Sequence, residues 1–175
     1  WQDASNVNIA GYIGINAGTV GSPGLYINGS STTGIFSTGS NIINVTTSGS
    51  ERLRIDASGN VVVTGSGGLG YGTGSGGAVT QTISRGTGVT LDKTNGAITL
   101  FTAAGSSTPT SFTVTNATVA ATDTVVVSVK SSTNVYATFV TAVSTGSFVI
   151  TFYALSGTAS DTPVFNFAVI KAAIA

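Results

Sequence analysis

Apolar and polar residues alternate over short stretches along most of this chain, a period of two that indicates β-strands with one buried face. In residues 1–64 each stretch covers only three to seven residues, and Gly, Ser and Asn separate the stretches. Turn dipeptides such as Asn28-Gly29 and Gly59-Asn60 fall between them. The pattern predicts a succession of short β-hairpins, with strands at 7–9, 12–15, 25–28, 34–36, 41–47, 51–56 and 60–64.

Residues 78–175 carry longer strands with a cleaner alternation and no helical period. This pattern predicts an antiparallel β-sandwich, jelly-roll-like, with strands at 79–84, 88–91, 97–101, 111–116, 124–130, 135–143, 147–153 and 164–171. The predicted core consists of Phe112, Val114, Val125, Val127, Val129, Val135, Ala137, Phe139, Phe148, Ile150, Phe152, Phe165, Phe167 and Val169.

The opposite faces of these strands also carry apolar residues, namely Val126, Val140, Val149, Val164 and Ile170. A strand that is apolar on both faces is normally covered on both. Because a small domain rarely covers both faces of such strands alone, we expect a subunit interface to supply the second cover.

A Gly-rich segment separates the two regions. Residues 65–77, GSGGLGYGTGSGG, contain eight glycines, and such a composition is typical of a flexible linker. It lacks the flanking strand, helix and Lys that a phosphate-binding loop requires. The predicted organisation is therefore a β-hairpin neck at 1–64, a linker at 65–77 and a β-sandwich at 78–175.

Within the neck, residues 51–56 (ERLRID) concentrate four of the twelve charged residues of the chain. Leu53 and Ile55 alternate with Arg52 and Arg54, so one face is apolar and the other cationic. A single short hairpin is marginal in water because it cannot bury its apolar face. We expect Leu53 and Ile55 to face an axis between copies of the chain, with Arg52 and Arg54 paired to carboxylates as a structural clamp.

The composition favours a folded, self-associating protein. Charged residues make up only 7% of the 175 residues, hydrophobic residues make up 41%, and the net charge is zero. Disordered chains have the reverse composition, and a neutral surface lacks the repulsion that keeps molecules apart. No basic stripe is present, so we expect no nucleic-acid partner.

The residue inventory argues against catalysis and cofactors. The chain has no Cys and no His, which excludes disulfides, zinc sites and Ser-His-Asp or Cys-His chemistry. Asp92, Asp123 and Asp161 each lie in a turn-like context, where capping is the expected role. The turn at 56–60, DASGN, distantly resembles a calcium loop, but with a single carboxylate a plain turn is favoured. We expect no enzyme activity, no cofactor and no metal.

No apolar run approaches the ~18 residues that span a bilayer, and no signal peptide opens the chain, so membrane insertion is not expected. The chain lacks Met and begins at Trp1. We expect it to be part of a longer polypeptide whose upstream residues hold an attachment function.

Receptor recognition is the activity that this inventory supports. Uncharged sugar-binding sites commonly combine an aromatic face with Asn, Ser or Thr on loops of a rigid scaffold. The candidates are Asn134 with Tyr136, and Tyr153 with the loop at 156–162. The alternative is that both tyrosines lie at a subunit interface or on a sheet surface.

Two stretches carry a resemblance to a known family. Residues 32–65, TTGIFSTGSNIINVTTSGSERLRIDASGNVVVTG, resemble a repeat unit of tailed-bacteriophage structural proteins. Residues 70–100, GYGTGSGGAVTQTISRGTGVTLDKTNGAITL, resemble the start of a domain at the distal end of phage fibres, and this second resemblance covers roughly residues 70–175.

The resemblance implies a homotrimeric tail fibre or receptor-binding protein of the virion, with a host surface glycan or protein as its partner. Other virion proteins would bind it through the upstream residues. A capsid-attached head fibre or decoration protein is the alternative, and a non-catalytic part of a polysaccharide depolymerase is a third reading.

Overall fold

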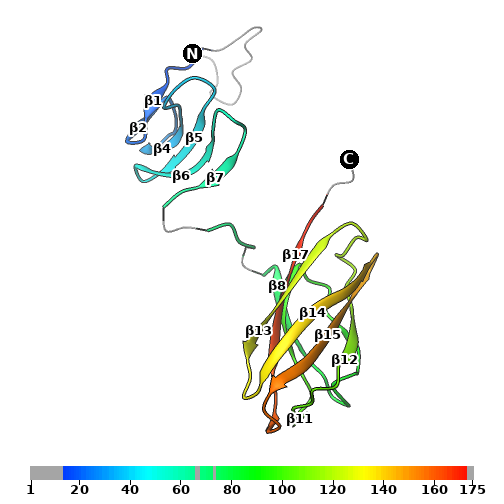
Figure 1. The fold of residues 1–175 in the computed structure, drawn as a ribbon. Coiled ribbons are helices and arrows are strands. Elements are labelled where there is room, and N and C mark those ends of the chain that lie inside the picture. The colour runs from blue at the N-terminus through cyan, green and yellow to red at the C-terminus, as the bar shows by residue number, and fades with distance from the viewer. Residues whose placement is uncertain (1–13, 66–67, 73, 173–175) are drawn as a thin grey trace. The chain divides into compact units, whose positions relative to one another are not determined.

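The computed structural model describes residues 14–65, 68–72 and 74–172, and these residues contain β-strands and no helix. The chain divides between Gly70 and Tyr71 into two compact units, here called the N-terminal and the C-terminal unit. The all-β class predicted from the alternating pattern is confirmed (Figure 1). Since the described residues include no helix, none of them forms a helix long and apolar enough to cross a membrane.

The N-terminal unit is built on a five-stranded antiparallel sheet whose strands follow one another in chain order. Its strands are β3 (Leu25–Ile27), β4 (Ser30–Phe36), β5 (Ile43–Thr47), β6 (Ser50–Ile55) and β7 (Val61–Val63). Two short strands precede them, β1 (Gly18–Thr19) and β2 (Ser22–Pro23), which pair with each other. Ser48 and Gly49 adopt positive φ angles of 52° and 68° and close the tight turn between β5 and β6.

The segment before β3 covers one face of this sheet. The Val20 carbonyl accepts a hydrogen bond from Thr46 Oγ1 at 3.0 Å, and the Ala17 carbonyl accepts one from the Ser37 amide at 2.8 Å. Under this cover Phe36 is 4% exposed, while Asn44 and Thr46 are fully buried. One face of the sheet is thus packed within the unit.

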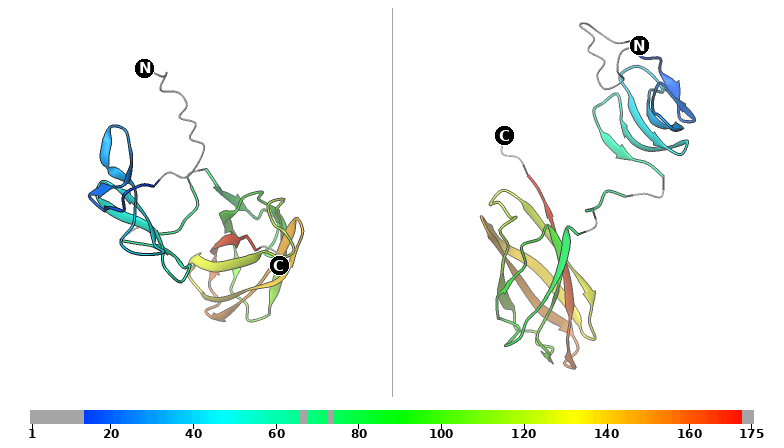
Figure 2. Two further views of the ribbon diagram at one scale, coloured as in Figure 1. Left: turned by 90° about the horizontal axis from the view of Figure 1, so that it is seen from above. Right: turned by 180° about the vertical axis from the view of Figure 1, so that it is seen from behind.

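The C-terminal unit is a sandwich of two four-stranded sheets, which appear as two layers in Figure 2. The first sheet has the order β13-β17-β10-β8 and the second β14-β15-β12-β9. A short ladder, β11-β16, lies at one end. The bounds are β8 (Gly76–Thr80), β9 (Val89–Thr90), β10 (Asn95–Thr99), β11 (Ala103–Ala104), β12 (Thr110–Thr115), β13 (Thr124–Ser131), β14 (Val135–Ser144), β15 (Ser147–Ser156), β16 (Ser160–Asp161) and β17 (Val164–Ile170).

Most pairings in the sandwich are antiparallel, but the edge strands β8 and β9 pair parallel to β10 and β12. The chain passes from β8 in the first sheet to β9 in the second and returns to the first as β10, so β8 and β10 run in the same direction. The predicted antiparallel β-sandwich is confirmed, and the two parallel edge pairings are a detail that local alternation does not reveal.

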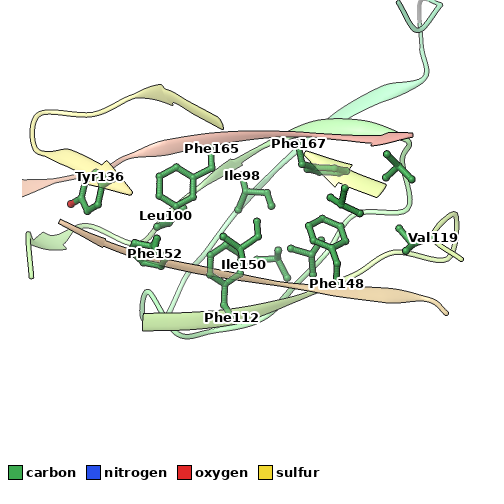
Figure 3. Close-up of a cluster of buried hydrophobic side chains, with 14 of the residues drawn as sticks. Ile98, Leu100, Phe112, Val119, Tyr136, Phe148, Ile150, Phe152, Phe165 and Phe167 are labelled. Atoms are coloured by element: carbon green, nitrogen blue, oxygen red, sulfur yellow. The ribbon is translucent and has the colours of Figure 1, made fainter. Parts of the chain in front are cut away.

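Aromatic and aliphatic side chains fill the space between the two sheets (Figure 3). Phe165 and Phe167 of β17 meet Phe152 and Phe148 of β15, with ring centroids 5.2 Å apart in both pairs. Ile150 is fully buried between them. Burial of each such side chain stabilises the fold by about 1.5–3 kcal/mol.

The predicted core is correct on β12, β13, β15 and β17 but wrong on β14. Val135 is 56% exposed and Phe139 49% exposed, and Ala137 pairs with Tyr153 on the outer face, whereas Tyr136 is buried. Register shifts after Val135 and after Val140 interrupt the alternation along this strand. Between these shifts the alternation persists, but it buries the face of Tyr136 and Val140 and not the predicted face of Val135, Ala137 and Phe139.

Candidate functional site

Tyr136, one of the predicted receptor contacts, lies inside the sandwich (Figure 3). It is 8% exposed, and its ring packs edge-on against Phe152 and Phe165 with centroids 6.0 and 6.1 Å away. Its hydroxyl accepts a hydrogen bond from Arg85 Nη1 at 2.7 Å and donates one to Asp161 Oδ1 at 2.8 Å. The hydroxyl is thus used within the protein, as a buried tyrosine requires.

Arg85 is the centre of this buried polar cluster, and its side chain is only 10% exposed. Nη2 donates to Asp161 Oδ1 at 2.6 Å, forming a buried ion pair. The remaining donors bind the carbonyls of Phe101, Ala103, Ala104 and Asp161. The guanidinium therefore ties the β11–β16 ladder to the end of the sandwich.

Asp161 remains ionised in this buried position. Its Oδ2 accepts backbone hydrogen bonds from Thr133 and Asn134, both at 3.1 Å. Burial raises the pKa of the Asp161 carboxyl, but hydrogen bonds from the Asn134 backbone, the Tyr136 hydroxyl, Arg85 and the Thr133 backbone outweigh it and lower the pKa from 3.8 to about 2.

Asn134, the second predicted receptor contact, is also buried, with 4% exposure. Its side-chain amide donates to the Ala159 carbonyl at 2.7 Å and accepts from the Ala159 amide at 3.2 Å. Neither Asn134 nor Tyr136 presents its polar atoms to a receptor. The Arg85–Asp161–Tyr136–Asn134 cluster is a structural clamp on the loop that joins β15 to β16.

Tyr153, the third predicted contact, is half-buried on the outer face of the β14-β15-β12-β9 sheet. It stacks on Phe139 with ring centroids 6.1 Å apart and an interplanar angle of 18°. Thr151 Oγ1 beside them shares hydrogen bonds with the hydroxyls of Ser111 and Thr141, both at 2.8 Å. No charged residue occurs in the four strands of this sheet, so the face offers a neutral surface of aromatic rings and hydroxyls.

In the N-terminal unit, Leu53 and Ile55 lie on a face of the five-stranded sheet that is largely exposed among the described residues, with Ile15 bordering it beside Leu25 and Ile35. The strand register places Leu53 in a row of five aliphatic residues, one from each strand: Leu25, Ile35, Val45, Leu53 and Val63. A second row consists of Ile43, Ile55 and Val61. These eight residues are here called the aliphatic face, and six of them are 36–66% exposed.

The two arginines of the same strand form polar contacts within the unit. Arg54 Nε lies 3.7 Å from Glu51 Oε1, and Glu51 Oε2 accepts a hydrogen bond of 2.7 Å from the buried Asn44. Arg52 Nε donates to Thr47 Oγ1 at 2.9 Å. The Arg54–Glu51 pair lies within β6, while the Glu51–Asn44 and Arg52–Thr47 bonds join β6 to β5, which is a structural role.

The turn at 56–60 uses its carboxylate to close the loop. Asp56 Oδ1 accepts from the amides of Ser58 and Asn60 at 2.9 Å, and Oδ2 accepts from Asn60 Nδ2 at 3.0 Å. The Asn60 side chain, with these backbone bonds and Arg54, lowers the pKa of Asp56. Within the described ranges, no three Asp or Glu side chains come together in a group that could hold a metal ion.

No family model matches the chain, and neither the curated proteins nor the solved structures contain a match.

Sequence reasoning missed the role of Arg85. It lies in a Gly-containing loop, SRGTG, whose composition predicts only a turn. The available signal is that Arg85 and Asp161 are two of very few charged residues in a mainly apolar region, where an isolated charge needs a partner.

Proposed function

We propose that this chain is a non-catalytic structural protein of a tailed-phage virion, a homotrimeric fibre or receptor-binding protein that adheres to the host surface through its C-terminal unit. The observation that supports the assembly is the aliphatic face. Monomeric proteins rarely expose contiguous apolar patches larger than a few hundred Å². Eight aliphatic side chains on one sheet face therefore need a cover.

The chemistry of the aliphatic face favours another copy of the same chain as that cover. It contains no charged side chain, and the opposite face of the sheet is already packed against residues 14–23. Identical aliphatic faces around an axis can bury one another without leaving a charge unpaired. Three copies are the number implied by the resemblance to phage fibres.

Adhesion is the function proposed for the C-terminal unit. Its neutral outer face around Phe139 and Tyr153 combines exposed rings with hydroxyls, the chemistry suited to an uncharged glycan or protein surface. Three weak sites on one rigid assembly raise the overall avidity without any new contact.

A charge placed in the aliphatic face tests the assembly. Ile35→Lys introduces a cation into the five-residue row of the aliphatic face, and Ser40→Lys adds the same charge in the exposed turn between β4 and β5. We expect light scattering to show a single-chain mass for Ile35→Lys and an unchanged oligomer for Ser40→Lys. Equal masses for the two variants would contradict the proposed interface.

Adsorption competition separates fibre from capsid roles. Purified chain added to host cells before the phage should reduce adsorption if the chain binds the receptor. Unimpaired infection at saturating protein would favour the head fibre or decoration protein. Release of reducing ends from host polysaccharide would instead support a depolymerase.

A further inference from the structure

A shallow hollow of about 420 Å³ lies on the outer face of the β13-β17-β10-β8 sheet. Because Phe165, Phe167 and Val169 point into the core, the alternate residues of β17 face outward. The positions beside them are small, with Ala97 opposite Asn166 and Gly76 opposite Asn95. The hollow exists because these small residues leave space between larger neighbours.

The polar side chains that line this hollow are Asn95, Ser128, Lys130 and Asn166, and none of them forms a side-chain hydrogen bond with another described residue. Asn95 Oδ1 is buried and without a partner. A Cβ at Gly76 would lie 2.9 Å from this oxygen, so the glycine leaves room for the amide.

The three buried asparagines in the described part of the chain behave differently. Asn44, Asn116 and Asn134 are buried, and each uses its side-chain amide in hydrogen bonds of 2.7 Å. Buried or half-buried amides are normally satisfied in this way. Asn166, half-buried on the neighbouring strand, borders the hollow and forms no side-chain hydrogen bond with another described residue, so its amide is available to a molecule outside the chain.

Lys130 adds an uncompensated positive charge to the hollow. Each of the other five basic residues has a polar partner: Arg52 bonds Thr47, Arg54 pairs with Glu51, Arg85 with Asp161, Lys93 bonds the Gly74 carbonyl and Lys171 pairs with Asp123. Lys130 has no such partner among the described residues and is exposed. The ligand that suits the hollow therefore carries a negative charge.

The spacing of the groups suits a sugar ring. Asn166 lies directly opposite Ser128, and Asn95 lies on the diagonal from Asn166 across β10 and β17. Cβ atoms are about 5 Å apart in such opposite pairs and about 7–8 Å apart on the diagonal. Two amides and a hydroxyl, each able to donate and accept, can therefore contact neighbouring hydroxyls of one ring.

We propose that this hollow binds an acidic sugar unit, a pyranose whose ring hydroxyls bond Asn95, Ser128 and Asn166 and whose carboxylate pairs with Lys130. The exposed Val126 beside it offers apolar contact to the ring. A volume near the low end of small-molecule sites limits the occupant to one or two sugar rings. The biological role of this site rests on the adhesive function proposed above, and an acidic sugar is then the class of receptor that the chain binds.

Saturation-transfer difference NMR on the full chain tests the site with glucuronate, galacturonate and N-acetylneuraminate, with glucose and acetate as controls. We expect millimolar binding of at least one acidic sugar. Lys130→Gln should weaken binding of the acidic sugar about tenfold and leave glucose binding unaffected. Asn166→Ala should weaken binding of both the acidic sugar and glucose. Lys93→Gln removes the same charge outside the hollow and should leave all affinities unchanged.

Failure of all three acidic sugars to bind, or equal weakening by Lys130→Gln and Lys93→Gln, would overturn the assignment. Thermal unfolding of each variant checks that the fold is intact, which is expected because the substituted side chains face outward. Light scattering on the same samples reports assembly independently, so failure of sugar binding is distinguishable from failure of the proposed oligomer.

Discussion

Removal of the Arg85 guanidinium tests whether the buried clamp is structural. Arg85→Met keeps an unbranched apolar stem but removes the ion pair with Asp161, the bond to Tyr136 and the bonds to four backbone carbonyl groups. Breaking a buried ion pair from one side costs about 3–5 kcal/mol, because the remaining charge stays buried without compensation.

The structure places the expected cost near the lower end of that range. Asp161 keeps three hydrogen bonds after the substitution, from Tyr136, Thr133 and Asn134. A loss of about 3 kcal/mol is a large part of the ~5–15 kcal/mol that stabilises a typical domain. It should lower the melting temperature of the C-terminal unit by roughly 12–24 °C.

Chemical denaturation at fixed protein concentration measures this change. Lys93→Met is the matched control, because Lys93 forms a single bond of 3.3 Å to the Gly74 carbonyl at the surface. It should cost at most about 0.5 kcal/mol. The double variant Arg85→Met with Asp161→Asn should be less destabilised than the sum of the single variants, since no unpaired charge remains. A loss below about 1 kcal/mol for Arg85→Met would refute the clamp.

Three further predictions concern the C-terminal unit. The folded-state pKa of Asp161, about 2, lies below its ordinary 3.8, so its contribution to stability is complete above about pH 5 and is lost as the pH falls through 2. Denaturation at a series of pH values should show this loss as about 1–2 kcal/mol, allowing for solvent screening, and Asp161→Asn should lack it. Gly157→Ala should lower the unfolding free energy by about 2 kcal/mol or more, because φ is +91° and a Cβ would lie 2.3 Å from Asn134 Oδ1. Gly146→Ala, with φ +82° and open space around the Cβ, should lower it by only about 1 kcal/mol. Equal melting temperatures for the two variants would contradict this expectation. Tyr153→Ala should change the unfolding free energy by less than about 1 kcal/mol yet weaken competition for phage adsorption, and unchanged competition would remove Tyr153 from the proposed adhesive surface.

Local alternation predicted β15 and β17 well because their inward residues form unbroken aromatic and aliphatic series, such as Phe148, Ile150 and Phe152. It failed on β14 because the buried position of Tyr136 depends on Arg85, which lies 51 residues earlier in the chain. A tyrosine hydroxyl is buried without a large free-energy cost only where it has a hydrogen-bond partner, and a two-residue period in the sequence does not show where such a partner lies.

The candidate surfaces show the same limit. Leu53 and Ile55 were predictable as an apolar pair, but the aliphatic face arises from the register of five strands, which includes an irregularity between Val45 and Thr46. The hollow depends on small residues at Gly76 and Ala97, which come from different strands. Neither surface has a continuous signature in the sequence.

The mass of the intact chain in dilute solution tests the central claim most directly. If the aliphatic face is buried between three copies, light scattering should give three times the chain mass of 17.3 kDa, and the value should hold on dilution. A stable mass of 17.3 kDa would leave the aliphatic face in water and contradict the proposed assembly.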